Sequence, residues 1–265
     1  MMRIIVLFFM LLVSFVSAKD EYKYDISLVG MSMDYREYDD NSQILDSEKS
    51  DFTQMIGVEF GLTYLLDSAN ANYSQFDFSV LLLSGQTDYV GAYLAGGGGY
   101  GSLLGKTNNN ITNLDLDYLY NIKLDDKLYL FTGAAFGYRE WERALSANQI
   151  ETYSWVYLEP KIGMNYLYKQ INIEAKAGYK YGVNPTMTAT GIGDKFKLGS
   201  ANTLNVSLAL AYKIATHSEL FCEYVYENQI ISKSNIVFAS DGNGYVEPDS
   251  EANNQYIKFG VAFKY

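Results

Sequence analysis

The sequence predicts an all-β protein: a closed antiparallel up-and-down transmembrane β-barrel of ten strands, with eight strands as the alternative. Three observations support this prediction. Many segments alternate between apolar and polar or small side chains, and the connections between them alternate between short and long. Aromatic residues are abundant, with 25 Tyr, 14 Phe and 2 Trp. A period of two is the signal of a strand, and membrane barrels carry aromatic side chains at both interfaces.

The first eighteen residues have the pattern of a secretory signal peptide. Arg3 precedes an apolar run from Ile4 to Val13, and the small residues Ser17 and Ala18 end the segment. The run is shorter than the roughly 20 residues of a membrane-spanning helix. We therefore expect residues 1–18 to be a cleaved signal peptide and residues 19–265 to form the outer-membrane β-barrel.

Charge and cysteine content exclude other classes of protein. The chain has 31 acidic and 20 basic residues, a formal net charge of −11. Binding to nucleic-acid phosphates needs clustered Lys and Arg, so no nucleic-acid partner is expected. The single cysteine, Cys222, cannot form an internal disulfide. Stability must therefore come from strand pairing and packing.

The segment 53–66 shows the alternation clearly. Its larger apolar side chains are Ile56, Val58, Phe60, Leu62 and Tyr64, and they alternate with Gly57, Glu59, Gly61 and Thr63. The same division recurs near 111–124, 171–183, 204–214 and 257–265. A soluble β-sandwich also alternates, so this pattern alone does not separate a sandwich from a membrane barrel.

The connections between the predicted strands separate these two folds. The predicted strands are 22–35, 53–66, 75–86, 111–124, 127–139, 152–168, 171–183, 201–214, 219–231 and 254–265. Short links lie at 67–74, 125–126, 169–170 and 215–218, and long polar ones at 37–52, 86–110, 140–151, 184–200 and 232–253. Short periplasmic turns alternating with long external loops are typical of outer-membrane barrels. An even number of strands then places both the N-terminus and the C-terminus in the periplasm.

Outward-facing tyrosines near the predicted strand ends fit two interfacial girdles. We expect Tyr64, Tyr166, Tyr168 and Tyr212 at the periplasmic interface and Tyr138, Tyr181 and Tyr226 at the outer one.

The faces predicted to point into the lumen carry charges of both signs. They are Glu59, Asp77, Asp115, Asp117, Glu159, Glu174 and Glu223 on the acidic side, and Lys161, Lys176, Lys180, Lys213 and Lys258 on the basic side. Unpaired charges in a narrow, low-dielectric interior are costly, so these groups should pair. Glu159 with Lys161, and Glu174 with Lys176, lie on adjacent predicted strands. We expect ion pairs that narrow or close the lumen.

The C-terminal segment resembles the insertion signal of outer-membrane proteins. Lys258 is followed by Gly260, and aromatic residues follow at Phe263 and at the terminal Tyr265. With the signal peptide and the alternating connections, residues 19–265 resemble the small outer-membrane β-barrel family that includes the OmpA and OmpX barrels. The resemblance implies a bacterial outer-membrane location, lipid contact and recognition by the barrel assembly machinery during biogenesis. It carries over no catalytic or binding residue.

No motif in the sequence predicts an enzyme, a cofactor or a metal site. The only histidine, His217, falls in a predicted periplasmic turn, whereas outer-membrane barrel enzymes generally use a histidine on the external side or facing lipid. A zinc site needs several His or Cys ligands. The glycine-rich stretch 96–107 ends in Gly105, Lys106 and Thr107, but Tyr100 replaces the first glycine of a phosphate loop. We expect a flexible external loop there.

Two functions remain from the sequence. The first is a structural or surface-display barrel with a lumen filled by side chains, whose long external loops bind an unidentified extracellular ligand. The alternative is a narrow, porin-like channel for ions or small solutes. Ten strands are far fewer than the 16 to 18 of open porins, and small barrels tend to be filled by side chains. The sequence therefore favours the display barrel.

Overall fold

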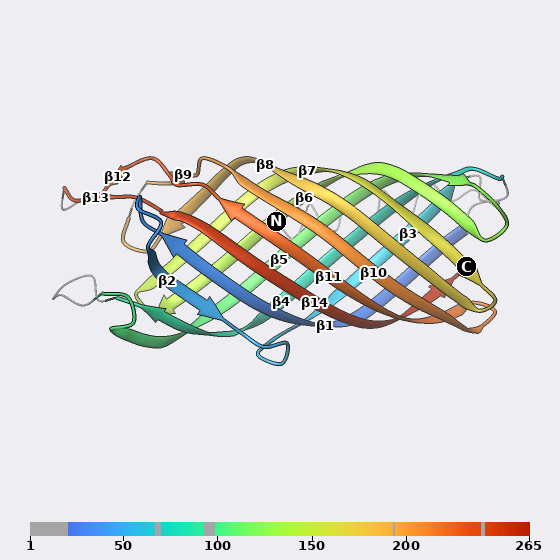
Figure 1. Ribbon diagram of the computed structural model, residues 1–265, viewed down its shortest axis with the longest axis horizontal. Helices are drawn as coiled ribbons and strands as arrows, with labels where there is room; N and C mark the ends of the chain where they lie inside the picture. Colours follow the sequence, from blue (N-terminus) through green and yellow to red (C-terminus); the bar gives the residue numbers. More distant parts are fainter. Residues whose placement is uncertain (1–20, 67–69, 93–98, 193, 240–241) are drawn as a thin grey trace.

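The computed structural model describes residues 21–66, 70–92, 99–192, 194–239 and 242–265. Ten long strands of these residues form a closed antiparallel barrel (Figure 1). They are β1 (Glu21–Tyr38), β3 (Met55–Leu66), β4 (Tyr73–Gly91), β5 (Leu103–Lys123), β6 (Leu128–Ser146), β7 (Gln149–Tyr168), β8 (Ile171–Ala189), β10 (Ala201–Ala215), β11 (Ser218–Ile231) and β14 (Asp249–Lys264). The predicted signal peptide, 1–18, lies outside the described residues.

The barrel closes between its first and last strands. β1 pairs with β14 from Lys23 opposite Lys264 to Tyr38 opposite Asp249, and pairs with β3 on its other side. Every other long strand pairs with its neighbours in chain order. The predicted fold class and the ten strands are confirmed, and the eight-stranded alternative is wrong because β1 is paired along both edges.

Alternation along each strand separates a lipid-facing surface from a lumen. On β10, Leu204, Val206, Leu208 and Leu210 point outward and are 44 to 51% exposed, whereas the intervening Thr203 and Ser207 are buried inside the barrel. Exposed apolar side chains on a closed barrel are stable only in contact with lipid. Tyr168 and Tyr212, which lie near the short turns, and Tyr181, which lies farther from them, are exposed on the same outer surface.

The apolar outer band covers only the half of the barrel that carries the short turns, which we call the short-turn end. Towards the other, long-loop end the outward positions become polar, for example Ser84, Gln86 and Asp88 on β4. Several strands continue well past their predicted limits there: β4 runs to Gly91 and β5 begins at Leu103. These extensions were missed because the outward side chains contact water there and lose the apolar alternation. The long-loop half therefore projects beyond the membrane-spanning segments.

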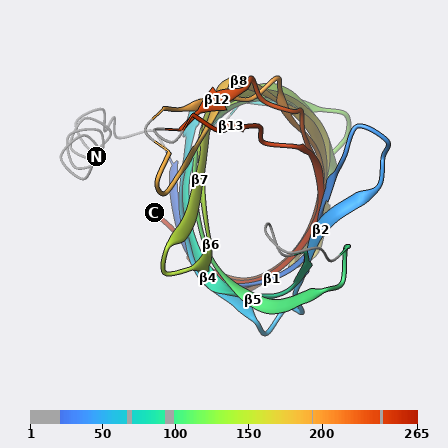
Figure 2. The ribbon, with the colours of Figure 1, turned by 90° about the vertical axis from the view of Figure 1, so that its left-hand side faces the viewer.

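Short strands lie in the segments predicted as long loops. They are β2 (Ile44–Lys49), β9 (Phe196–Lys197), β12 (Val237–Phe238) and β13 (Gly244–Tyr245). β2 pairs with both β1 and β4, so it continues the position of β3 in the wall after a break at 50–54. Figure 2 shows β2 leaning out from the barrel wall and β12 and β13 at the mouth.

The loop in the glycine-rich stretch 96–107 is also shorter than predicted. Residues 103–107 belong to β5 and pair with β4, whereas 96–98 lie outside the described residues. Within the part of the chain that the structure describes, no helix is long and apolar enough to cross a membrane.

Candidate functional site

The lumen contains nearly all of the predicted charged residues. At the short-turn half it holds a cavity of about 270 Å³. The predicted residues that line it are Glu59, Asp77, Asp115, Asp117, Glu159, Lys161, Glu174, Lys176, Lys180, Glu223 and Lys258. Lys213 does not line it: this side chain is exposed beyond the end of the lumen, because β10 there reaches its turn.

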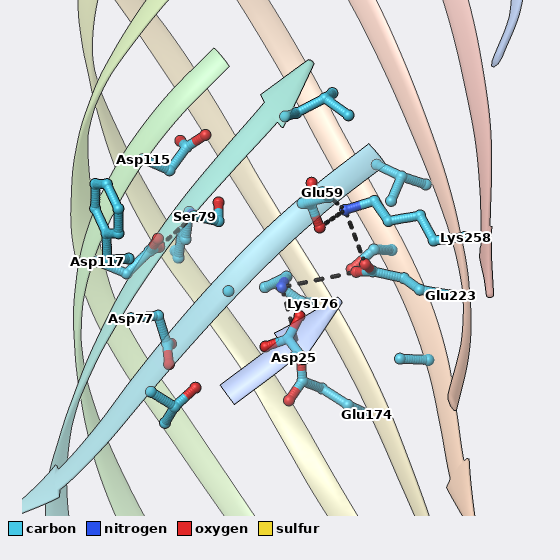
Figure 3. Close-up of a pocket in the computed structure, with 18 of the residues that line it drawn as sticks. Asp25, Glu59, Asp77, Ser79, Asp115, Asp117, Glu174, Lys176, Glu223 and Lys258 are labelled. Atoms are coloured by element: carbon cyan, nitrogen blue, oxygen red, sulfur yellow. Dashed lines mark hydrogen bonds and ion pairs between the residues drawn. The ribbon is translucent and has the colours of Figure 1, made fainter. Parts of the chain in front are cut away.

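A lumen ion cluster links the walls of this cavity (Figure 3). Lys258 Nζ lies 2.8 Å and 3.0 Å from the two carboxylate oxygens of Glu59 and 3.1 Å from Glu223. Lys176 lies 3.8 Å from Glu223 and 3.4 Å from Glu174. The cluster therefore connects β3, β14, β11 and β8 through charge-assisted contacts.

Two further groups of ion pairs lie among the side chains that line the lumen. Lys161 contacts Asp117 and lies 3.1 Å from Glu159. Lys180 donates to Glu227 at 2.6 Å, and Arg139 approaches the same carboxylate at 3.6 Å.

Sequence reasoning missed Glu227 and Arg139, together with Asp25, which also lines the cavity. All three lie at positions of predicted strands where the alternation makes the side chain face inward. Applying the alternation along the full length of each predicted strand would have identified them.

On the long-loop side of the cavity, the lumen is filled by apolar side chains. This aromatic plug contains Tyr35, Trp141, Tyr153 and Trp155, together with Met31, Met33, Met55 and Met187, all at most 3% exposed. The Trp141 ring lies 5.1 Å from that of Tyr35 and 5.0 Å from that of Tyr153, measured between centroids. β1 lies opposite β6 and β7 in the ring of strands. The Tyr35–Trp141 contact therefore crosses the lumen.

An arginine cage lies on the long-loop side of the plug. The guanidinium of Arg143 donates to four carboxylates, with distances of 2.5 Å to Glu37, 3.2 Å to Asp46, 2.7 Å to Glu48 and 2.9 Å to Glu151. The Arg143 side chain is 1% exposed. β1, β2, β6 and β7 are thus joined through one cation, from opposite sides of the barrel.

Acidic groups outnumber the basic one in this cage. Burial, followed by the negative charge of Glu37, raises the pKa of Asp46 to about 7 despite the opposing effect of Arg143. Glu247, from the segment after β13, accepts a hydrogen bond of 2.5 Å from the Tyr153 hydroxyl. Burial and the charge of Glu37 raise the pKa of Glu247 well above its ordinary value. Protons therefore help to neutralise the cage.

The predicted C-terminal signal forms the end of β14. Lys258 points into the lumen, whereas Phe263 and Tyr265 are exposed on the outer surface at 40% and 74%. A Cβ at Gly260 would lie 2.4 Å from the Phe221 ring and 2.5 Å from the Ile26 carbonyl oxygen. The glycine is therefore required by close packing in the closing strands.

His217 lies in the turn between β10 and β11, at the short-turn end. Its backbone carbonyl accepts a hydrogen bond from the Lys264 amide. Among the described residues, no group of three or more His, Cys, Asp and Glu side chains has the geometry to hold a metal ion.

Comparison with solved structures gives the fold a context. The chain aligns with the crystal structure of the outer membrane protease OmpT from Escherichia coli with a TM-score of 0.59, at 11% identity, over 95% of this chain and 99% of that one. The chain has the fold of an outer-membrane β-barrel protein. This likeness concerns the fold alone, because the identity is too low to carry over an activity.

Other solved barrels are less similar. The translocator domain of the autotransporter NalP from Neisseria meningitidis aligns with a TM-score of 0.46 at 10% identity, over 94% of this chain and 90% of that one. The outer membrane protein OprG from Pseudomonas aeruginosa aligns with a TM-score of 0.44 at 13% identity, over 93% and 95%. No family model and no curated protein matches the sequence.

Proposed function

We propose that this protein is a closed barrel of the bacterial outer membrane that presents its long-loop end outside the cell as an interaction surface. The observation that carries this proposal is the Tyr35–Trp141 contact, which joins opposite walls inside the lumen. Arg143 adds a second crossing, from β6 to Glu37 on β1. Two layers of side-chain contacts that span the lumen leave a solute no straight path.

The connections between the strands support the orientation that we propose. β1 begins and β14 ends beside each other at the short-turn end, where Lys23 lies opposite Lys264. Short turns lie on the periplasmic side of such barrels, which supports a periplasmic position for both chain termini. We also propose that Lys258, Gly260, Phe263 and Tyr265 act as the signal for the barrel assembly machinery.

The long-loop end offers the binding surface. Ile236 and Phe238, next to or within β12, are 59% and 67% exposed, although they lie beyond the apolar band that faces lipid. Apolar side chains that form a contiguous exposed patch outside a membrane favour an interaction site. An extracellular ligand is thus proposed to bind at this hairpin and the neighbouring loops. A catalytic function is not part of this proposal.

Cysteine labelling of intact cells tests closure and orientation together. In a Cys222→Ala background, we compare Asn148→Cys in the exposed β6–β7 loop, Thr216→Cys in the exposed β10–β11 turn, and Ser79→Cys in the cavity. A membrane-impermeant thiol reagent should label position 148 only. After the outer membrane is broken, position 216 should react as well.

Two results would contradict the proposal. Labelling of position 216 but not 148 in intact cells would reverse the orientation. Labelling of position 79 from outside, at a rate near that of position 148, would show an open lumen.

A further inference from the structure

A polar seam crosses the level of the aromatic plug along the walls of β11, β14 and β1. Its five side chains point inward and are almost completely buried: Glu227 is 3% exposed, Asn254 0%, Gln229 1%, Ser250 3% and Glu37 7%. The buried side chains of β6, β7 and β8 in the plug include Trp141, Trp155 and Met187. The plug therefore has a polar wall on β11, β14 and β1 beside its apolar and aromatic side chains.

The strand registers make the seam continuous. Glu227 is directly opposite Asn254, and Ser250 is directly opposite Glu37. Gln229 is opposite Ala252, so it is diagonal to both Asn254 and Ser250. Opposed residues in a sheet are about 4.5 to 5.5 Å apart, and diagonal ones about 7 to 8 Å. Each step is short enough for one water molecule to connect the two side chains.

Several atoms of the seam have no hydrogen-bond partner among the described residues. They are Nδ2 and Oδ1 of Asn254, Oε1 of Gln229 and Oγ of Ser250. Buried polar groups without a partner are costly and uncommon in native proteins. Buried water molecules usually satisfy such groups, each making about three hydrogen bonds. The unpartnered atoms along the middle of the seam are therefore positioned to bind buried water.

Both ends of the seam reach ionisable groups. At the cavity end, Glu227 accepts hydrogen bonds from Lys180 at 2.6 Å and from the Tyr256 hydroxyl at 3.1 Å. At the long-loop end, Glu37 accepts from Tyr35 at 2.7 Å and from Arg143 at 2.5 Å. The seam thus connects the polar cavity with the arginine cage.

We infer that the polar seam holds a file of buried water molecules and conducts protons through a barrel that is closed to solutes. When the first water molecule of the file binds a proton, it gives up one of its other protons to the next water molecule. Each O–H bond that forms is thus matched by one that breaks. One positive charge crosses for each proton. In a vesicle, K⁺ moving the other way through valinomycin balances that charge.

Proteoliposomes with an internal pH-sensitive dye test this inference. The full-length mature protein is reconstituted, valinomycin and K⁺ are supplied, and a pH gradient is imposed. The protein should dissipate the gradient faster than protein-free liposomes. Asn254→Leu and Gln229→Met each replace a seam residue by an apolar one of similar size, and each should lower the proton flux about tenfold.

Asn253→Leu is the matched control, because Asn253 lies on the outer face of the same strand and accepts a hydrogen bond from Tyr226. Its flux should equal that of the unmodified protein. Each variant is first checked for the heat-dependent gel shift of a folded barrel, and Gln229→Met decides the matter if Asn254→Leu does not fold.

Three outcomes would overturn the inference. These are a flux equal to that of protein-free liposomes, an undiminished flux in the two seam variants, or an equal loss in the control. None of them would affect the proposed closed barrel, which stepwise salt conductance would contradict instead.

Discussion

Replacing Arg143 by methionine is expected to destabilise the folded barrel by about 3 to 5 kcal/mol, the usual cost of removing one partner from a buried ion pair. Four carboxylates surround this guanidinium, and Glu48 is 0% exposed. Without the cation they would repel one another in a low-dielectric site. Urea unfolding in lipid vesicles, followed by the fluorescence of Trp141 and Trp155, measures the change.

Arg36→Met is the matched control. Arg36 pairs with Asp34 at 3.1 Å on the outer surface, where the two side chains are 40% and 34% exposed. Exposed pairs contribute little, so its effect should stay within about 1 kcal/mol. Adding Glu48→Gln to Arg143→Met should recover part of the lost stability, since it removes one of the repelling charges. If the two arginine variants lost equal stability, the cage would not be a structural centre.

Replacing Asp46 by asparagine should make the stability of the barrel less dependent on pH. The pKa of Asp46 is raised to about 7 by burial and by Glu37. Between its unfolded pKa, about 4, and pH 7, only the folded state keeps this proton. The stability that Asp46 contributes is therefore complete below pH 4 and is lost as the pH rises through 7, on the order of 4 kcal/mol.

The measurement compares the free energy of unfolding of both proteins at pH 4 and pH 8. The asparagine variant should gain stability relative to the unmodified protein at pH 8 but not at pH 4. Asp39→Asn should show the opposite sign, because hydrogen bonds from the Gln43 and Asn41 backbone amides lower the pKa of Asp39. A difference for Asp46→Asn that is the same at both pH values would contradict the raised pKa.

The membrane-spanning half of the fold could be predicted from the sequence because lipid and lumen impose opposite polarities on alternate residues. That rule placed Glu59 and Lys258 on inner faces, and the structure brings them to 2.8 Å. Above the lipid, outward residues such as Gln86 and Asp88 face water, so the pattern that marks a strand disappears. The extended ends of β4 and β5 could not be predicted for this reason.

The arginine cage could not be predicted in the same way. Arg143 is separated by 106 residues from Glu37 and by 95 from Glu48. Alternation gives the face of a residue but not its height in the barrel, which depends on strand tilt and register. The segment of β2 that carries Asp46 and Glu48 was also expected to be loop. Only the complete register shows that these groups meet at one level.

Single-channel recording of the purified protein in a planar bilayer tests the closed lumen most directly. The aromatic plug and the arginine cage should prevent stable conductance in concentrated KCl, since Trp141 on β6 contacts Tyr35 on β1 across the barrel. The expected result is a flat current trace from protein that shows the folded gel shift. Stable, stepwise openings from that same protein would contradict closure and favour the narrow channel.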